Sequence, residues 1–96
     1  MRKRCRANGL DCDLTNDWVR EKFAAGVCEM TGIEFDMSVS RSANSPSIDR
    51  INPAGPYTKE NCRMILWSLN RALSNHGEEY MFDLFKRIFE KRGMLR

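Results

Sequence analysis

The sequence lacks any apolar run that approaches the roughly 20 residues a membrane-spanning helix requires. It also lacks the apolar core of a secretory signal peptide, because its basic first residues are followed by more polar ones. It contains no internal repeat and no low-complexity segment. We therefore expect a soluble protein. Histidine is nearly missing, so His76 is the only candidate for a histidine general base.

Cysteine occurs four times, at Cys5, Cys12, Cys28 and Cys62. Because no signal peptide precedes them, we interpret these residues as reduced thiols rather than as a disulfide framework. The expected location is the cytoplasm, where disulfides are rare.

The 96 residues, of which 42% are apolar and 30% charged, are enough for one globular domain and too few for two. A core of this size stabilises a fold only modestly, so a metal ion, a partner chain or nucleic acid would add to its stability. The formal net charge is +3, and basic residues cluster at both ends, at Arg2, Lys3, Arg4, Arg6, Lys86, Arg87, Lys91, Arg92 and Arg96. Such clusters suit a phosphate backbone, and a solvated surface is the alternative.

The pattern of apolar and turn-forming residues predicts an α+β fold. Thr15 and Asn16 are good helix starts and Gly26 is a good stop, which indicates a short helix near 17–25. The elements expected after it are a small hairpin within 27–35, a polar loop over 36–46, strands at 47–51 and near 62–66, and a helix near 67–74.

A longer helix is predicted near 77–92. Glu78 and Glu79 occupy its first turn and basic residues its last, as the helix dipole favours, and Gly93 is a good stop. Its apolar stripe is interpreted as part of the core and consists of Tyr80, Met81, Phe82, Leu84, Phe85, Ile88 and Phe89.

Three polar residues suggest a site for chemistry. A strand presents Asp49, a turn-rich loop delivers Asn61, and the helix that follows offers Asn70. Hydrolysis of a phosphodiester requires neutralisation of charge on the phosphate and on the leaving oxygen, which a hard divalent cation on oxygen ligands achieves. A carboxylate and an amide are suitable ligands for such a cation.

The order and spacing of these residues resemble the HNH, or ββα-metal, endonucleases, over roughly residues 18–79. The resemblance rests on Cys28-Glu29-Met30-Thr31-Gly32, on Ser47-Ile48-Asp49-Arg50-Ile51, and on Asn61 and Asn70, and it is closest to small members frequent in phage genomes. It implies one HNH-like domain with a core motif at about 27–75. It also implies Mg²⁺ or Mn²⁺ on Asp49 and Asn70, a loop steadied by Asn61, and cleavage of DNA to 5′-phosphate and 3′-hydroxyl ends.

The sequence departs from the family at the structural zinc knuckle. Of its four positions only Cys28 keeps a thiol, and Thr31, Leu66 and Leu69 occupy the others. Structural zinc takes four nitrogen or sulfur ligands, so we expect no structural zinc here and an apolar cluster in its place. A site built from all four cysteines is the less favoured alternative.

A second departure concerns the general base, because Arg50 stands where the family has histidine after the metal-binding aspartate. A guanidinium stays protonated and cannot accept a proton from water, but it can bind the scissile phosphate. The base would then be His76, Asp49, Tyr57 or a metal-bound hydroxide. An exposed loop histidine with no role is the plain alternative for His76.

We expect contacts with DNA from Arg50, Lys59, Arg63 and Arg71, which lie near Asp49 or Asn70 in the sequence, and a solvated face is the equal alternative for the arginines. Trp67 is expected in the core, with a base-stacking role as the less favoured alternative. The resemblance and these residues together predict that the protein is a metal-dependent DNA endonuclease. Two alternatives stay open. One is a DNA-binding module that kept the fold without catalysis, and the other is an interaction subunit whose long helix forms a homodimer or docks on a larger phage or host assembly.

Overall fold

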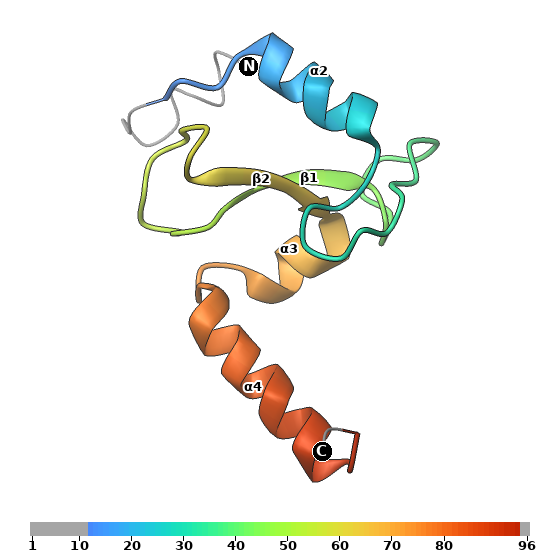
Figure 1. The fold of residues 1–96 in the computed structure, drawn as a ribbon, viewed down its shortest axis with the longest axis vertical. Coiled ribbons are helices and arrows are strands. Elements are labelled where there is room, and N and C mark those ends of the chain that lie inside the picture. The colour runs from blue at the N-terminus through green and yellow to red at the C-terminus, as the bar shows by residue number, and fades with distance from the viewer. Residues whose placement is uncertain (1–11, 95–96) are drawn as a thin grey trace.

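The computed structural model describes residues 12–94, which form a small α+β arrangement of three helices and one two-stranded antiparallel sheet (Figure 1). The α+β class predicted from the sequence is confirmed at this level. Within these residues, every helix is too short or too polar to cross a membrane.

Helix α2 (Asn16–Ala25) begins and ends as the sequence indicates. The Oγ1 of Thr15 accepts a hydrogen bond from the backbone N–H of Trp18 at 3.1 Å, which caps the first turn. Gly26 ends the helix with φ 72°, a left-handed conformation that side chains disfavour. Trp18 is the residue of this helix that is buried in the core.

The predicted hairpin within 27–35 is present only as a tight turn. The backbone N–H of Cys28 donates to the carbonyl of Ile33 at 2.8 Å, and a single bridge joins Val27 to Glu34. No strand ladder forms at 27–35, so the prediction of a hairpin with two strands is wrong. The polar loop that follows leads to the buried Ser45, whose carbonyl accepts a hydrogen bond from Trp67 N–H.

The sheet pairs β1 (Pro46–Arg50) with β2 (Cys62–Leu66), and α3 (Trp67–Leu73) begins directly after β2. These bounds agree with the predicted strands and helix to within a residue. Strand β2 supplies the centre of the core, with Met64 and Ile65 almost fully buried. The remaining core residues come from both sides of the sheet and are Leu14, Trp18, Cys28, Phe35, Cys62, Leu66 and Leu73.

The cysteines divide into two groups. Cys28 and Cys62 are free and buried, whereas Cys12 is disulfide-bonded. The prediction of reduced thiols is therefore wrong for Cys12, and cysteine usage does not support a cytoplasmic location.

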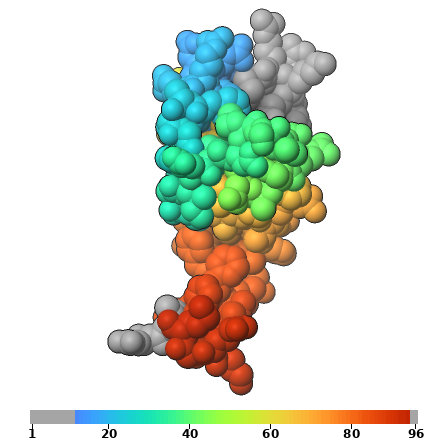
Figure 2. All heavy atoms as spheres, turned by 90° about the vertical axis from the view of Figure 1, so that its right-hand side faces the viewer, coloured from blue at the N-terminus to red at the C-terminus, as the bar shows by residue number. Residues whose placement is uncertain are grey.

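Helix α4 (Glu78–Lys91) projects away from the rest of the protein (Figures 1 and 2). None of its residues is buried, and only Met81 and Phe85 pack against the edge of the core. The prediction that its stripe belongs to the core is wrong. An amphipathic pattern indicates that one face favours an apolar neighbour, but it does not say which surface supplies that neighbour.

Candidate metal and phosphate site

Asp49 is one of the few polar residues in the interior. It lies on β1 with 5% of its surface exposed and stands opposite Arg63 of β2 in the strand register. The Oδ2 of Asp49 accepts a hydrogen bond from Arg63 Nε at 2.9 Å. The same guanidinium donates through Nη1 to Glu78 Oε1 at 2.8 Å. A carboxylate–guanidinium–carboxylate chain therefore links β1, β2 and the start of α4.

Burial raises the pKa of the Asp49 carboxyl above its ordinary value, although the hydrogen bond and charge of Arg63 act to lower it. Removal from water disfavours the anion, and one guanidinium shared with Glu78 does not fully offset that effect. A second positive charge near this carboxylate would therefore be favourable.

Asn70 of α3 is held against β1. Its Nδ2 donates to Ser47 Oγ at 2.7 Å and to the carbonyl of Ile48 at 3.0 Å. These two bonds use the amide nitrogen, so the carbonyl oxygen of Asn70 is the atom left for other ligands. Among residues 12–94 this oxygen accepts no hydrogen bond, and neither does Oδ1 of Asp49.

Asp49 and Asn70 line the same surface cavity, which has a volume of about 200 Å³. The strand carboxylate and the helix amide, 21 positions apart in the sequence, are therefore brought together by the turn from β2 into α3. The rest of the lining consists of Ile48, Arg50, Pro53, Tyr57, Ser74 and Asn75. Ser74 and Asn75 were not singled out from the sequence, and their polarity in a loop gave no signal that they lie there.

Arg50 reaches this cavity from the end of β1. Its guanidinium lies 4.8 Å from the ring centroid of Tyr57, and its Nη1 donates to the carbonyl of Gly55 at 3.1 Å. Ring and carbonyl hold the cation in place while leaving it only partly buried. Arg50 is thus a fixed positive charge at the rim, which is the placement that phosphate binding requires.

Asn61 braces the loop between the two strands. Its Oδ1 accepts from Asn52 N–H at 2.9 Å, and its Nδ2 donates to the carbonyls of Asn52 and Pro56 at 3.1 and 2.9 Å. The loop closes so tightly that a Cβ on Gly55 would lie 2.8 Å from Asn61 Nδ2. Asn61 does not line the cavity, and its contacts are those of a residue that shapes the loop.

A second cavity of about 360 Å³ adjoins the first, since Asn70 and Ser74 line both. The rest of its lining consists of Ser47, Trp67 and Arg71. The Arg71 guanidinium lies 5.1 Å from the centroid of the Trp67 ring. Trp67 is half-buried and outside the core, so its predicted core placement is wrong. The four-residue spacing on a helix was the signal that could have indicated this pair.

The other basic residues predicted to contact DNA are placed differently. Arg63 has a side chain that is only 13% exposed and is used by its two carboxylate partners, so it faces inward. Burial acts to lower the pKa of Arg63, but its hydrogen bonds to Glu78 and Asp49 outweigh this and raise it. Lys59 is exposed, and its backbone N–H donates to Asp13 Oδ1 at 2.7 Å.

His76 is exposed and is not brought to the cavity that Asp49 and Asn70 line. Its ring lies 5.9 Å from that of Tyr80, centroid to centroid, and it borders a separate hollow with Ile51 and Glu78. Pro53 is the residue that separates the two hollows, since it lines both. The geometry does not favour His76 as a general base.

Three of the four positions that the resemblance assigns to a zinc knuckle form the predicted apolar cluster, whereas Thr31 is exposed. Cys28 is 1% exposed, Leu66 is buried beside it in the core, and Leu69 packs against that core. Burial acts to raise the pKa of Cys28, but hydrogen bonds from Thr31 and nearby backbone groups outweigh it and lower the pKa. No group of three histidine, cysteine or acidic residues converges within residues 12–94. The absence of zinc stays a prediction.

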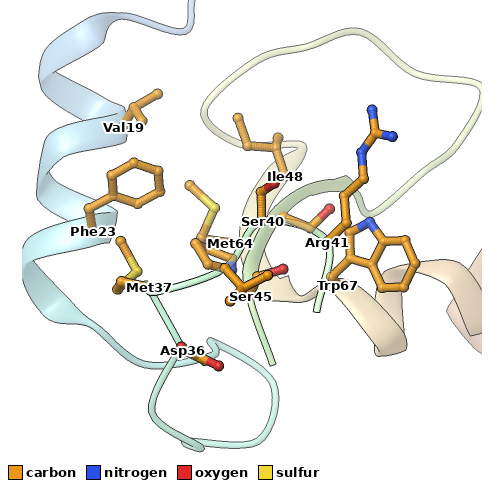
Figure 3. A pocket seen from close by; sticks show the side chains of 13 residues that line it. Val19, Phe23, Asp36, Met37, Ser40, Arg41, Ser45, Ile48, Met64 and Trp67 are labelled. Carbon is orange, nitrogen blue, oxygen red and sulfur yellow. The ribbon is translucent and has the colours of Figure 1, made fainter. Parts of the chain in front are cut away.

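An open groove of about 540 Å³ lies between α2 and the loop before the sheet (Figure 3). Val19 and Phe23 of α2 face Met37 and Met64 across it, and Arg41 and Trp67 stand at its far edge. Its lining combines apolar side chains with an acid, Asp36, a base, Arg41, and three serines.

Comparison of the chain with protein-family models, with curated proteins and with solved structures finds no match in any of the three. The functional argument therefore depends on the residues themselves.

Proposed function

We propose that this chain is a divalent-metal-dependent DNA endonuclease of the HNH type, with its site in the cavity lined by Asp49 and Asn70. The observation that carries the proposal is that these two side chains, which the sequence resemblance implies as metal ligands, border one cavity of about 200 Å³. Two strands followed directly by a helix position them, which is the order that the resemblance implies.

The donor atoms suit Mg²⁺ or Mn²⁺. Each residue offers an oxygen that accepts no hydrogen bond within residues 12–94, and a carboxylate with an amide oxygen is a set that hard cations accept. Mg²⁺ keeps several of its waters in proteins, and the cavity has room for them. When bound, such an ion supplies neutralisation of charge on the phosphate and on the leaving oxygen.

Arg50 would bind the scissile phosphate. It is held at the rim of the same cavity by Tyr57 and Gly55, so little reorganisation is needed when the anion arrives. Arg71 extends the positive surface toward the second cavity, and the Trp67 ring beneath it offers an apolar face to a sugar or base. The bond to be broken would lie between these two cations, with 5′-phosphate and 3′-hydroxyl ends as products.

The weakest part of the site is the acceptor for the proton of the attacking water. His76 lies outside the cavity and Arg50 cannot accept a proton, so Asp49 and Tyr57 are the titratable residues of the lining that remain. Tyr57 carries the Arg50 guanidinium over its ring. We therefore expect slow cleavage compared with an enzyme that has a well-placed histidine.

The test is nicking of supercoiled plasmid in Mg²⁺ or Mn²⁺, with EDTA as the metal-free control. Asp49→Asn removes the charge of the proposed ligand and weakens its ion pair with Arg63. The matched control is Glu78→Gln, which weakens the other ion pair of Arg63 and does not alter the lining of the cavity. We expect nicking by the wild type and by Glu78→Gln, and at least about a hundredfold loss in Asp49→Asn. Equal activity of both variants would rule out the proposed role of Asp49.

A second candidate, a DNA-binding module without catalysis, is favoured by one observation. No histidine lines the cavity, so the site lacks the side chain that most often accepts a proton from an attacking water. This candidate predicts salt-sensitive binding of DNA, no nicking in any metal, and affinity that falls in Arg50→Ala and Arg71→Ala but not in Asp49→Asn. Binding and nicking measured on the same variants distinguish the two functions.

A further inference from the structure

We infer that the apolar face of α4 pairs with the same face of a second copy of this chain, with the two helices antiparallel. The first observation is the exposure of large apolar side chains on this one helix. Phe82, Ile88 and Phe89 are between 40% and 51% exposed. Phe82, Phe85 and Phe89 recur at three- and four-residue spacing, so they lie along one side of the helix.

The chain does not cover this face itself within the described residues. Helix α4 contacts α3 near its start and extends from there into solvent (Figures 1 and 2). Fourteen residues make a rod about 21 Å long, so the half that carries Ile88 and Phe89 is well beyond the core. A monomer of this size seldom leaves such a face in water.

The area fits a second copy. An aromatic or large aliphatic side chain presents on the order of 150–200 Å² when free, so one that is half exposed offers about 80 Å². Three such side chains, Phe82, Ile88 and Phe89, from each of two helices would bury roughly 480 Å², and the stems of the flanking charged residues add to this area. An interface of this size is smaller than those of stable complexes and indicates a weak, reversible dimer.

The charges select the antiparallel arrangement. The first six residues of α4 carry three acids, Glu78, Glu79 and Asp83, and no base. Glu78 is already paired with Arg63 and Asp83 with Arg87, so Glu79 is the acid left to face a partner helix. Residues 86–92 carry four bases, Lys86, Arg87, Lys91 and Arg92, against one acid, Glu90, a sum of +3. Antiparallel pairing places the acidic half of each helix beside the basic half of its partner, whereas parallel pairing opposes like charges.

The self-complementary charge is the reason to choose a second copy over an unrelated protein. A two-fold axis through the middle of α4 matches every acidic half with a basic one, so the same patch serves both partners. The proposal is independent of the nuclease proposal, because no residue of the α4 face lines the Asp49 cavity.

Sedimentation velocity of the full chain from about 1 to about 500 µM tests the pairing, because a weak dimer changes its weight-average mass over that range. We expect a shift from monomer toward dimer, and a mass that stays monomeric throughout would overturn the proposal. Phe82→Glu should weaken dimerisation about tenfold or more. Phe23→Glu is the matched control, because Phe23 is also 42% exposed but lies on α2 beside the groove of Figure 3.

If Phe23→Glu weakens association and Phe82→Glu does not, the groove and not α4 forms the contact, and the proposal is wrong. Circular dichroism of each variant establishes that it is folded. The orientation is tested by Lys91→Glu combined with Arg92→Glu, which should weaken the dimer, and by the further change Glu79→Lys, which should restore it. Failure of that rescue would exclude the antiparallel arrangement.

Discussion

Arg63 neutralises two carboxylates in a nearly dry setting, and its replacement should be among the most damaging single changes in the chain. Its side chain is 13% exposed, that of Asp49 is 5% exposed and that of Glu78 is 32% exposed. In Arg63→Met the aliphatic stem keeps much of its packing, but both carboxylates lose their cation. Asp49 is then a buried anion with no partner among the ion pairs of residues 12–94.

The size of the effect follows from this burial. Removal of one partner from a buried ion pair costs about 3–5 kcal/mol, because the remaining charge stays out of water. Protonation of Asp49 would relieve part of the cost, since burial already raises its pKa, so we expect about 3 kcal/mol at neutral pH. Against a total stability of about 5–15 kcal/mol this is a large fraction.

Urea unfolding followed by circular dichroism measures the change. With an m-value of about 1.5 kcal/mol per molar, the midpoint should fall by about 2 M. Arg87→Met is the matched control. Its Nε lies 2.8 Å from Asp83 Oδ2, nearly the same separation, but the two side chains are 73% and 54% exposed. We expect its midpoint to be indistinguishable from that of the wild type.

Equal midpoints for Arg63→Met and Arg87→Met would refute the reasoning, because Arg63 is buried between two carboxylates whereas Arg87 has one exposed partner on the same helix. If Arg63→Met does not fold, Arg63→Lys keeps the charge and loses the forked geometry. That variant should be less stable than the wild type and more stable than any folded Arg63→Met.

Three further predictions concern the core, the loop and the helix of the site. Burial raises the pKa of Cys62 to about 11, so the stability that its neutral thiol contributes is complete below its unfolded pKa near 9 and is lost as pH rises through about 11. The difference between wild-type and Cys62→Ala stabilities should therefore shrink between pH 9 and pH 11, and a constant difference would show that this thiol does not titrate there. Gly55→Ala would force a Cβ to within 2.8 Å of Asn61 Nδ2, so we expect a loss of about 1–2 kcal/mol by urea unfolding, and an unchanged midpoint would mean that the loop relaxes freely. Asn70→Ala removes the bonds to Ser47 and Ile48 and should cost about 1–3 kcal/mol while also abolishing binding of Mn²⁺ in calorimetry, whereas retained binding would exclude this amide as a ligand.

Helix α2 and strand β2 were predictable because residues within and next to each element determine where it begins and ends. Thr15 and Gly26 mark the ends of α2 through their own side-chain and backbone preferences, and the structure begins and ends the helix at those residues. Strand β2 was placed correctly because it is a short apolar run between polar turns. Once β2 leads directly into α3, Asn70 must lie near β1, which is why the predicted pair of site residues shares a cavity.

The errors concern relations between distant parts of the chain. The apolar stripe of α4 was predicted to belong to the core. An amphipathic pattern indicates only that one face of a helix favours an apolar neighbour, and the turn at 74–77 directs this helix away from the core. Trp67 was predicted to lie in the core, but it follows a strand end and borders two surface hollows. The partnership of Arg63 with Asp49 depends on strand register, which the sequence alone did not give.

Diffraction from crystals soaked in Mn²⁺, with data collected near the manganese absorption edge, tests the central claim most directly. The account predicts one anomalous peak in the cavity of about 200 Å³, within about 2.0–2.4 Å of an oxygen of Asp49 and of the amide oxygen of Asn70. The peak should be absent in Asp49→Asn and present in Glu78→Gln. A cavity without manganese at saturating concentration, or a peak that contacts neither residue, would contradict the account.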